Sequence, residues 1–226
     1  VIDFLKLKES LIDRVEIVDG SPTLWHLRMR KSEAEIDRIR KICQISSEAY
    51  GSLTEKLSPG MTERDAARAL RVDINSRGAD STIFLPAISG QGGVSQIVCG
   101  PTDRELTEGD VLFLDTGSTF DGYFCDFDRN YAIGDISDEA KRAHELVWQA
   151  TSAGIQAAVS GATTDDLWEK MNRVLQAGGA NSSNVGRLGH GLGLQLTEPP
   201  SHMWGDGTVL ESGMVLTIEP GIEYSP

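Results

Sequence analysis

The sequence predicts an α+β fold, because helical and strand-like stretches follow one another in blocks along the chain. Apolar residues recur at helical spacing in two segments between residues 33 and 77. From Ser81 the pattern changes to short apolar runs separated by turn residues, and helical spacing returns between residues 137 and 178. We therefore expect an antiparallel sheet on which pairs of helices pack.

The first pair of helices is predicted over residues 33–57 and 62–77. Ser32 and Glu35 form a capping box, in which a hydroxyl and a carboxylate accept hydrogen bonds from amides at the start of the helix. A Ser-Pro-Gly turn at residues 58–60 separates the two helices.

Short β-strands are expected between the two helix pairs. Apolar runs at residues 82–88 and 94–98 flank a Gly-Gln-Gly-Gly stretch, which is typical turn material. Residues 111–115 are predicted as a buried strand, and residues 123–133 as its antiparallel neighbour across an Asp-Gly loop. Carboxylates gather around this hairpin.

The second pair of helices is predicted over residues 137–160 and 164–178. Ser137 is a typical N-cap for the first, and two aspartates lie in the first turn of the second, where the helix dipole favours negative charge. From Asn181 onward the chain is rich in glycine and loops, with one further strand predicted over residues 214–219.

The first 28 residues differ from the rest. An amphipathic segment, Phe4 to Leu11, is followed by a strand-like run, Val15 to Asp19, and the two resemble a last helix and strand without partners. We therefore expect residues 1–28 to be the tail of a missing N-terminal domain with its linker, and residues 29–226 to form the main domain. The chain begins without a methionine, which agrees with a start inside a longer protein.

The composition is that of a soluble globular protein, with 39% hydrophobic and 24% charged residues. A formal net charge of −13 opposes binding to nucleic acid or anionic lipid, and neither partner is expected. No run approaches the roughly 18 apolar residues of a membrane span. Three widely spaced cysteines are too few for a disulfide framework, so we expect buried, reduced thiols and a cytoplasmic location.

Four residues form the pattern that carries chemistry: Asp115, Asp126, His190 and Glu219. The carboxylates lie in or at the ends of predicted strands, where a buried negative charge needs a compensating arginine or metal ion. Two aspartates, a histidine and a glutamate form a ligand set suited to Mn²⁺, Fe²⁺, Co²⁺ or Zn²⁺. Two simpler interpretations stay open. Arg129 could neutralise Asp126 in a metal-free core, and His190 could be a structural imidazole.

Three motifs extend this pattern. They are Gly109 to Asn130 with the sequence GDVLFLDTGSTFDGYFCDFDRN, Gly189 to Gly193 with GHGLG, and Gly213 to Gly221 with GMVLTIEPG. In this order and spacing they resemble the pita-bread metallopeptidase family, which includes methionine aminopeptidase, aminopeptidase P, prolidase and the metal-free creatinase. The resemblance covers roughly residues 30 to 226.

The resemblance implies that residues 29–226 form a pita-bread catalytic domain, a curved antiparallel sheet covered by helix pairs. It implies that Asp115, Asp126, His190 and Glu219 are four of the five ligands of a centre that holds two divalent metal ions. A metal-activated water would attack a peptide bond next to proline, as in Xaa-Pro aminopeptidases and dipeptidases. The fifth ligand of the family is a glutamate on a later strand, so the chain is expected to lack the last strands.

Two positions depart from the peptidase pattern. The peptidase members carry a histidine before the first metal-binding strand and another seven residues after the ligand histidine, where this chain has Val98 and Thr197. The resemblance implies that Val98, Thr197 and Glu198 face the substrate, and the Thr197 hydroxyl could hydrogen-bond a substrate oxygen. His202 is the nearest replacement histidine, so Thr197 and His202 are the catalytic candidates. A solvent-exposed loop histidine is the alternative interpretation of His202.

We therefore expect a metal-dependent hydrolase similar to Xaa-Pro peptidases, acting on a peptide or another small molecule. One alternative is a non-peptidase enzyme, a creatinase-like hydrolase or lyase for a small zwitterionic substrate, which the departures at Val98 and Thr197 would suit. The other is a non-catalytic binding module, which the retention of all four ligands disfavours. The resemblance also implies that two copies pair as a homodimer.

Overall fold

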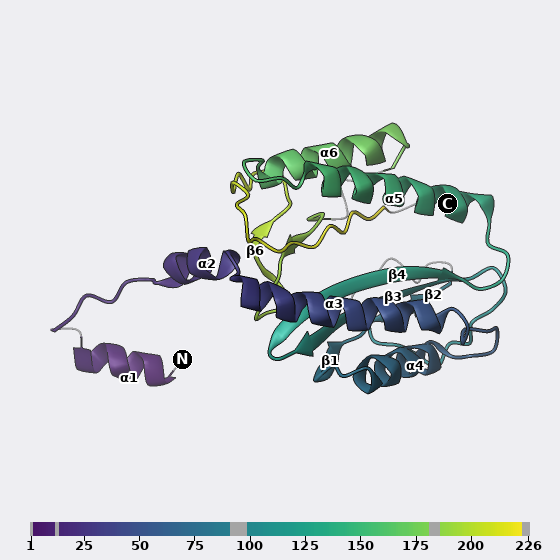
Figure 1. Ribbon diagram of the computed structural model, residues 1–226, viewed down its shortest axis with the longest axis horizontal. Coiled ribbons are helices and arrows are strands. Elements are labelled where there is room, and N and C mark those ends of the chain that lie inside the picture. The colour runs from purple at the N-terminus through teal and green to yellow at the C-terminus, as the bar shows by residue number, and fades with distance from the viewer. Residues whose placement is uncertain (1, 12–13, 91–98, 181–185, 223–226) are drawn as a thin grey trace.

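The computed structural model describes residues 2–11, 14–90, 99–180 and 186–222. It has the predicted α+β arrangement, with a sheet between two pairs of helices (Figure 1). The helices are α1 (Ile2–Leu11), α2 (Ser21–Met29), α3 (Glu33–Leu53), α4 (Glu63–Ser76), α5 (Asp138–Ala157) and α6 (Thr164–Ala177). The strands are β1 (Ser81–Phe84), β2 (Ala87–Ser89), β3 (Val111–Phe120), β4 (Tyr123–Ala132), β5 (His190–Gly191) and β6 (Glu198–Ser201).

The central strand of the main sheet is β3, which pairs along both of its edges. On one edge β4 pairs antiparallel with it along its whole length. On the other edge β2 pairs with the first half of β3 and β1 with the second half, both antiparallel. The run predicted over residues 82–88 is therefore two strands. Pro86 lies between them, and a proline has no N–H to donate to a ladder.

Helices α3 and α4 pack on one face of this sheet. Leu112 and Leu114 of β3 point to that face and are fully buried. Tyr50 of α3 reaches the sheet, where its hydroxyl donates to the carbonyl of Phe127 at 2.8 Å and lies 3.2 Å from the carbonyl of Leu114. One buried hydroxyl thus fastens α3 to both β3 and β4.

Helices α5 and α6 form the second pair, across the strands from α3 and α4 (Figure 1). Leu167 and Met171 of α6 pack in a separate core with residues from the C-terminal loops. Gly154 of α5 faces this core, and a Cβ there would collide with Met171 and Ile218. The missing side chain lets α5 lie close to the segment that contains Ile218.

The helix starts agree with the caps expected from the sequence. The Ser32 amide donates to the Glu35 carboxylate at 2.8 Å, as a capping box requires, and the Ser137 hydroxyl accepts from the amide of Ala140. Helix α2 lies where no helix is predicted. The sequence feature that indicates this helix is the proline after Ser21, because proline suits the first turn of a helix.

Two predicted strands are wrong. Residues 15–19 form no strand, because no described strand lies beside them. Residues 214–219 form no strand but two isolated bridges, one from Met214 to Arg30 and one from Leu216 to Gly191, although further backbone hydrogen bonds join them to residues 188–192. The strand predicted over residues 94–98 lies outside the described residues.

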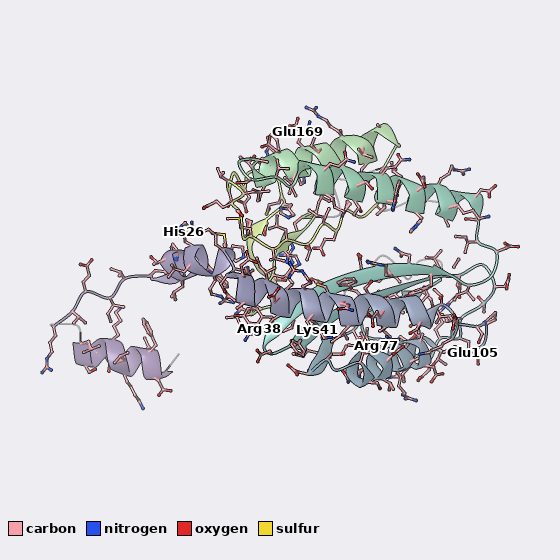
Figure 2. The ribbon with its side chains drawn as sticks, viewed as in Figure 1. His26, Arg38, Lys41, Arg77, Glu105 and Glu169 are labelled. Carbon is pink, nitrogen blue, oxygen red and sulfur yellow. The ribbon has the colours of Figure 1, made fainter. Side chains whose placement is uncertain are left out.

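Charged side chains cover the outer sides of the helices, as with Lys41 on α3 and Glu169 on α6 (Figure 2). On α3 Arg40 pairs with Asp37, so this face mixes both signs of charge. The three cysteines form no disulfide, and only Cys125 is fully buried. Among the described helices, none combines the length and the apolar character needed to cross a membrane.

Replacing Tyr50 by phenylalanine should lower the free energy of unfolding by about 1–2 kcal/mol, because two strand carbonyls lose their buried partner. Urea unfolding at equilibrium measures this change. Ser76 offers a comparison, because its exposed hydroxyl bonds only to its own helix. Ser76→Ala should change stability by less than about 0.5 kcal/mol. Equal effects of the two substitutions would contradict the role given to Tyr50.

Candidate metal centre

Three aspartates share one face of the hairpin formed by β3 and β4. Asp115 pairs directly with Asp128, and Asp126 pairs with Gly117, two residues along β3 from Asp115. Directly paired side chains point to the same face, and so do alternate residues of one strand. All three carboxylates therefore point away from the helices that bury Leu114 on the opposite face.

His190 and Glu219 come from two segments that backbone hydrogen bonds hold together. The amide of Thr217 donates to the carbonyl of His190 at 2.7 Å, and the amide of Glu219 donates to the carbonyl of Leu188 at 3.1 Å. Between these bonds Gly189 has a φ of 141°, and a Cβ there would collide with the carbonyl of Thr217. Glycine is therefore required for the close approach that brings His190 beside Glu219.

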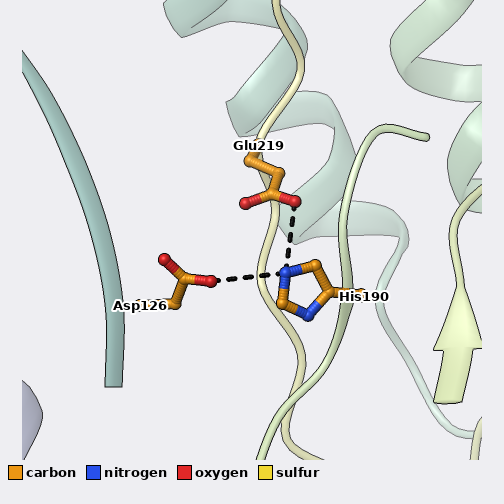
Figure 3. Close-up of side chains that lie close together, drawn as sticks. All are labelled: Asp126, His190 and Glu219. Atoms are coloured by element: carbon orange, nitrogen blue, oxygen red, sulfur yellow. Dashed lines mark ion pairs between the residues drawn. The ribbon is translucent and has the colours of Figure 1, made fainter. Parts of the chain in front are cut away.

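Asp126, His190 and Glu219 meet at one point (Figure 3). His190 Nε2 lies 3.3 Å from Asp126 Oδ2 and 3.4 Å from Glu219 Oε1. One ligand atom from each residue lies within 4.8 Å of the other two, a grouping that can hold a metal ion. The Glu219 side chain is 29% exposed, against 10% for Asp126.

Burial makes the carboxylates of this site hard to ionise together. Burial first, and then the negative charges of Asp126, Asp128 and Glu219, raises the pKa of Asp115 to about 8. Burial also raises the pKa of Glu219 to about 7, although His190 opposes the shift. Asp115 Oδ1 is buried and has no hydrogen-bond partner among the described residues. Either bound protons or a bound cation must therefore reduce the negative charge of this site.

His190 is oriented to bind a metal through Nε2. Its Nδ1 lies 2.7 Å from the carbonyl oxygen of Gly191. A carbonyl can only accept, so Nδ1 carries a proton, and Nε2 is the atom that can bind a metal once it has lost its own proton. Burial disfavours protonation of the ring, but hydrogen bonds to Asp126 and Gly191 outweigh it and raise the pKa of His190.

The donor set fits a divalent metal ion better than a metal-free ion-pair network. Arg129, the alternative partner for Asp126, lies over the ring of Phe127 instead, 4.9 Å from its centre. In the described part of the chain it makes no ion pair with Asp126. Asp115 lies outside the group of three, but its charge acts on the same carboxylates. Several carboxylates with one imidazole suit Mn²⁺, Fe²⁺, Co²⁺ or Zn²⁺.

Glu198 is buried in an ion-pair network rather than open to solvent. Its carboxylate lies 3.2 Å from Lys31 Nζ, pairs with Arg28 and accepts the amide of Gln195 at 3.1 Å. Both carboxylate oxygens are therefore occupied. The network connects the end of α2 and the residues after it to the loop that carries Thr197, which gives Glu198 a structural role. Its contact with substrate stays a prediction.

Thr197 is exposed, and its hydroxyl lies 3.3 Å from Arg187 Nη2, from which it accepts a hydrogen bond. Arg187 is a candidate that the sequence analysis missed. The available signal is a positive charge three residues before His190. Val98, the other departure from the peptidase pattern, lies outside the described residues.

The interpretation of His202 as an exposed loop histidine is wrong, because the residue is 0% exposed. Its ring lies so close to Gly189 that a Cβ on that glycine would collide with it. Burial lowers the pKa of His202 to about 4, so the ring is neutral near pH 7. A ring enclosed in this way has no open face for substrate, and its catalytic role stays a prediction that the burial does not support.

Comparison with known proteins finds a matching family and several relatives of this chain. The profile of metallopeptidase family M24 matches residues 37–226. The probable dipeptidase PepE of Mycobacterium tuberculosis is 35% identical over 206 residues, which cover 91% of this chain and 55% of the relative. The Xaa-Pro dipeptidase of Pyrococcus furiosus is 31% identical over 201 residues, which cover 88% of this chain and 57% of the relative.

Solved structures of related peptidases also resemble this chain. The X-Pro aminopeptidase from Thermotoga maritima has a TM-score of 0.92 at 28% identity, over 99% of this chain and 63% of that one. The prolidase from Pyrococcus furiosus has a TM-score of 0.84 at 29% identity, over 90% of this chain and 60% of that one. The pita-bread fold is thereby confirmed. The chain spans about 55–63% of the length of these four proteins.

Lys31→Met should lower the free energy of unfolding by about 3 kcal/mol, because it removes a cation from the buried Glu198 carboxylate. Arg30→Met is the matched control one residue away, since the ion pair of Arg30 with Glu211 is exposed. That control should cost less than about 1 kcal/mol. Urea unfolding of both variants measures the difference, and equal losses would show that the Glu198 network does not hold the loop.

Metal-free protein should become less stable as the pH rises from about 4 to 8. Asp115 ionises near its ordinary value of 3.8 when unfolded and near 8 when folded, so within that window the folded state alone keeps the proton. This contribution is fully present below the lower value and lost as the pH passes the upper one. Glu219, with a folded pKa of about 7, acts in the same direction.

A divalent cation competes with these protons, so added Mn²⁺ should raise the melting temperature more at pH 8 than at pH 6. Thermal unfolding with and without Mn²⁺ at the two pH values measures the increment. An equal or smaller increment at pH 8 would contradict the assignment of these carboxylates as metal ligands.

Proposed function

The chain belongs to metallopeptidase family M24, and we propose that it forms the catalytic part of a metal-dependent hydrolase that cleaves Xaa-Pro dipeptides. The observation that carries the proposal is the meeting of Asp126, His190 and Glu219 within 4.8 Å. Two relatives support the substrate class, since one is named a probable dipeptidase and another an Xaa-Pro dipeptidase. The chain spans only part of these relatives, so the activity of the whole protein is proposed from this part.

Each residue of the site would have a distinct task. Asp115, Asp126 and Glu219 would hold divalent ions together with Nε2 of His190. When bound, the ions would supply Lewis acidity and lower the pKa of a water molecule that can attack a peptide carbonyl. Glu219, whose Oε1 lies 3.4 Å from His190 Nε2, would be the residue that accepts a proton from this water and returns it to the leaving amine.

We propose two divalent ions, with Mn²⁺ preferred, because carboxylate oxygens dominate the ligand set. Three carboxylates and one imidazole exceed what one ion needs from the protein when it also binds water and substrate. The cytoplasmic location and the homodimer stay predictions from the sequence. The relatives are named as peptidases, which favours peptide cleavage over the alternative of a small zwitterionic substrate.

Asp126→Asn should lower kcat/KM for Ala-Pro by at least about 100-fold, because an amide is a weaker ligand for the ions than a carboxylate. Hydrolysis by the intact protein in Mn²⁺ measures the loss, and elemental analysis measures the bound metal. Asp37→Asn is the control, since Asp37 is an exposed carboxylate of α3. It should keep full activity and metal content.

Two results would overturn parts of this proposal. A wild-type protein that binds Mn²⁺ but cleaves no Xaa-Pro dipeptide would point to a different substrate on the same metal centre. A wild-type protein that binds no divalent ion would contradict the hydrolase itself.

A further inference from the structure

Lys31 is a buried lysine in the short connection between α2 and α3, where α2 lies beside β6 (Figure 1). Its side chain is 2% exposed, although lysine is rarely buried to this extent because the ammonium group loses its hydration. Its partner is the Glu198 carboxylate, whose Oε2 lies 3.2 Å from Nζ and whose side chain is 1% exposed. Arg28 pairs with the other carboxylate oxygen from a more exposed position. The ion pair of Lys31 with Glu198 is therefore enclosed on both sides.

Lys31 is also joined to the segment that carries Glu219. Its amide donates to the carbonyl of Gly213 at 2.8 Å. A Cβ on Gly213 would lie 3.0 Å from the carbonyl oxygen of Lys31, so the two main chains pass close to each other. Arg30, the preceding residue, forms a bridge with Met214. The start of the segment that leads to Glu219 is thus fixed at Lys31.

The segment that carries His190 reaches the same point. Gly193 follows His190 by three residues. A Cβ on Gly193 would lie 2.8 Å from Cε of Lys31 and 3.0 Å from a carboxylate oxygen of Glu198. The main chain at Gly193 therefore lies directly against the buried ion pair.

Gly193 extends the connection to β4. Its carbonyl accepts a hydrogen bond from the amide of Phe124 at 2.8 Å. Phe124 precedes Asp126 by two residues in the same strand. Asp126, His190 and Glu219 thus come from three stretches of chain, and main-chain contacts near each of them lead to Lys31.

We propose that Lys31, paired with Glu198, is a positioning residue for the metal centre. Their buried ion pair fixes the relative positions of the three stretches that carry Asp126, His190 and Glu219. The inference rests on the proposed metal-dependent function and deepens it. It gives Glu198 a part in the site that acts through the metal ligands, whereas the sequence analysis expects a contact with substrate.

The metal ligands need such a support because they do not hold themselves together. Without a cation, the carboxylates of Asp126 and Glu219 repel each other. Metal binding tolerates displacements of only about 0.2 Å in ligand distances. A buried ion pair is a stronger restraint than an exposed one, because the dielectric constant is lower around it. The ion pair of Lys31 with Glu198 is the buried restraint that borders these stretches.

The first test measures binding of Mn²⁺ to the intact protein by calorimetry. Lys31→Met should weaken this binding by at least about tenfold, because Glu198 then lacks the cation that fixes its loop. Glu198→Gln keeps the shape and an acceptor oxygen but loses the charge, so it should weaken binding by a smaller factor. This milder variant keeps the test valid if Lys31→Met does not fold.

Leu70→Ala is the matched control for a general loss of stability. Leu70 is fully buried in α4, in the core that α3 and α4 form with the main sheet. Alanine at this position should lower the midpoint of urea unfolding, as Lys31→Met does. It should leave the affinity for Mn²⁺ unchanged, because Leu70 is in a different core from the segments that meet at Lys31.

The second test needs no metal. The amides of Thr217 and Glu219 donate to the carbonyls of His190 and Leu188. In the metal-free protein, Lys31→Met should accelerate hydrogen exchange at these two amides by at least about tenfold, because the segment opens locally once its start is released. Leu70→Ala should instead accelerate exchange within α4.

Three results would overturn the role of Lys31. They are a Lys31→Met protein with the wild-type affinity for Mn²⁺, an equal loss of affinity in Leu70→Ala, and unchanged exchange at Thr217 and Glu219. A higher KM for Ala-Pro in Glu198→Gln with unchanged Mn²⁺ affinity would assign Glu198 to the substrate instead. A wild type that binds Mn²⁺ but cleaves no Xaa-Pro dipeptide would contradict the proposed function alone, since the affinities would still decide the role of Lys31.

Discussion

The candidate site requires the fold to hold several carboxylates of like charge close together in a buried place. Asp115 and Glu219 have pKa values of about 8 and 7, which shows that the folded chain without a cation resists their ionisation. His190 is the described residue that contacts both Asp126 and Glu219, and one imidazole cannot neutralise the cluster. Such a group is an unfavourable way to build a core, because buried like charges repel. It is a favourable way to prepare a site for divalent cations.

The two halves of the fold supply different parts of this group. The hairpin of β3 and β4 carries its aspartates on one face, while the opposite face is fastened to α3 through Tyr50. His190, in β5, and Glu219 come from C-terminal segments that pack on α5 and α6, and Gly189 permits their close approach. Neither half holds the complete ligand set. The packing of the two halves against each other therefore decides whether the site exists, which explains why a buried network around Glu198 joins distant segments there.

Local sequence patterns allowed much of the fold and of the site to be predicted. A capping box predicts the start of α3, and three motifs in order identify the family that the comparisons confirm. Contacts between distant segments could not be predicted in the same way. Lys31 and Glu198 are 167 residues apart, so no local pattern shows that the carboxylate is already paired. His202 is buried by packing against Gly189, and Arg187 donates a hydrogen bond to the Thr197 hydroxyl, a contact that no local pattern shows. Residues 214–219 have the apolar pattern of a strand, but their neighbour β5 is only two residues long, so they form isolated bridges and single backbone hydrogen bonds.

Asp126, His190 and Glu219 form either a metal centre, as proposed here, or a metal-free polar core. The most direct measurement is anomalous diffraction at the manganese absorption edge from crystals of the intact protein grown with Mn²⁺. We expect an anomalous peak among Asp126, His190 and Glu219, with Nε2 of His190 as its nitrogen ligand and Asp115 drawn to the same site. Crystals with no anomalous peak there, in which the carboxylates keep protons or pair with Arg129, would contradict it.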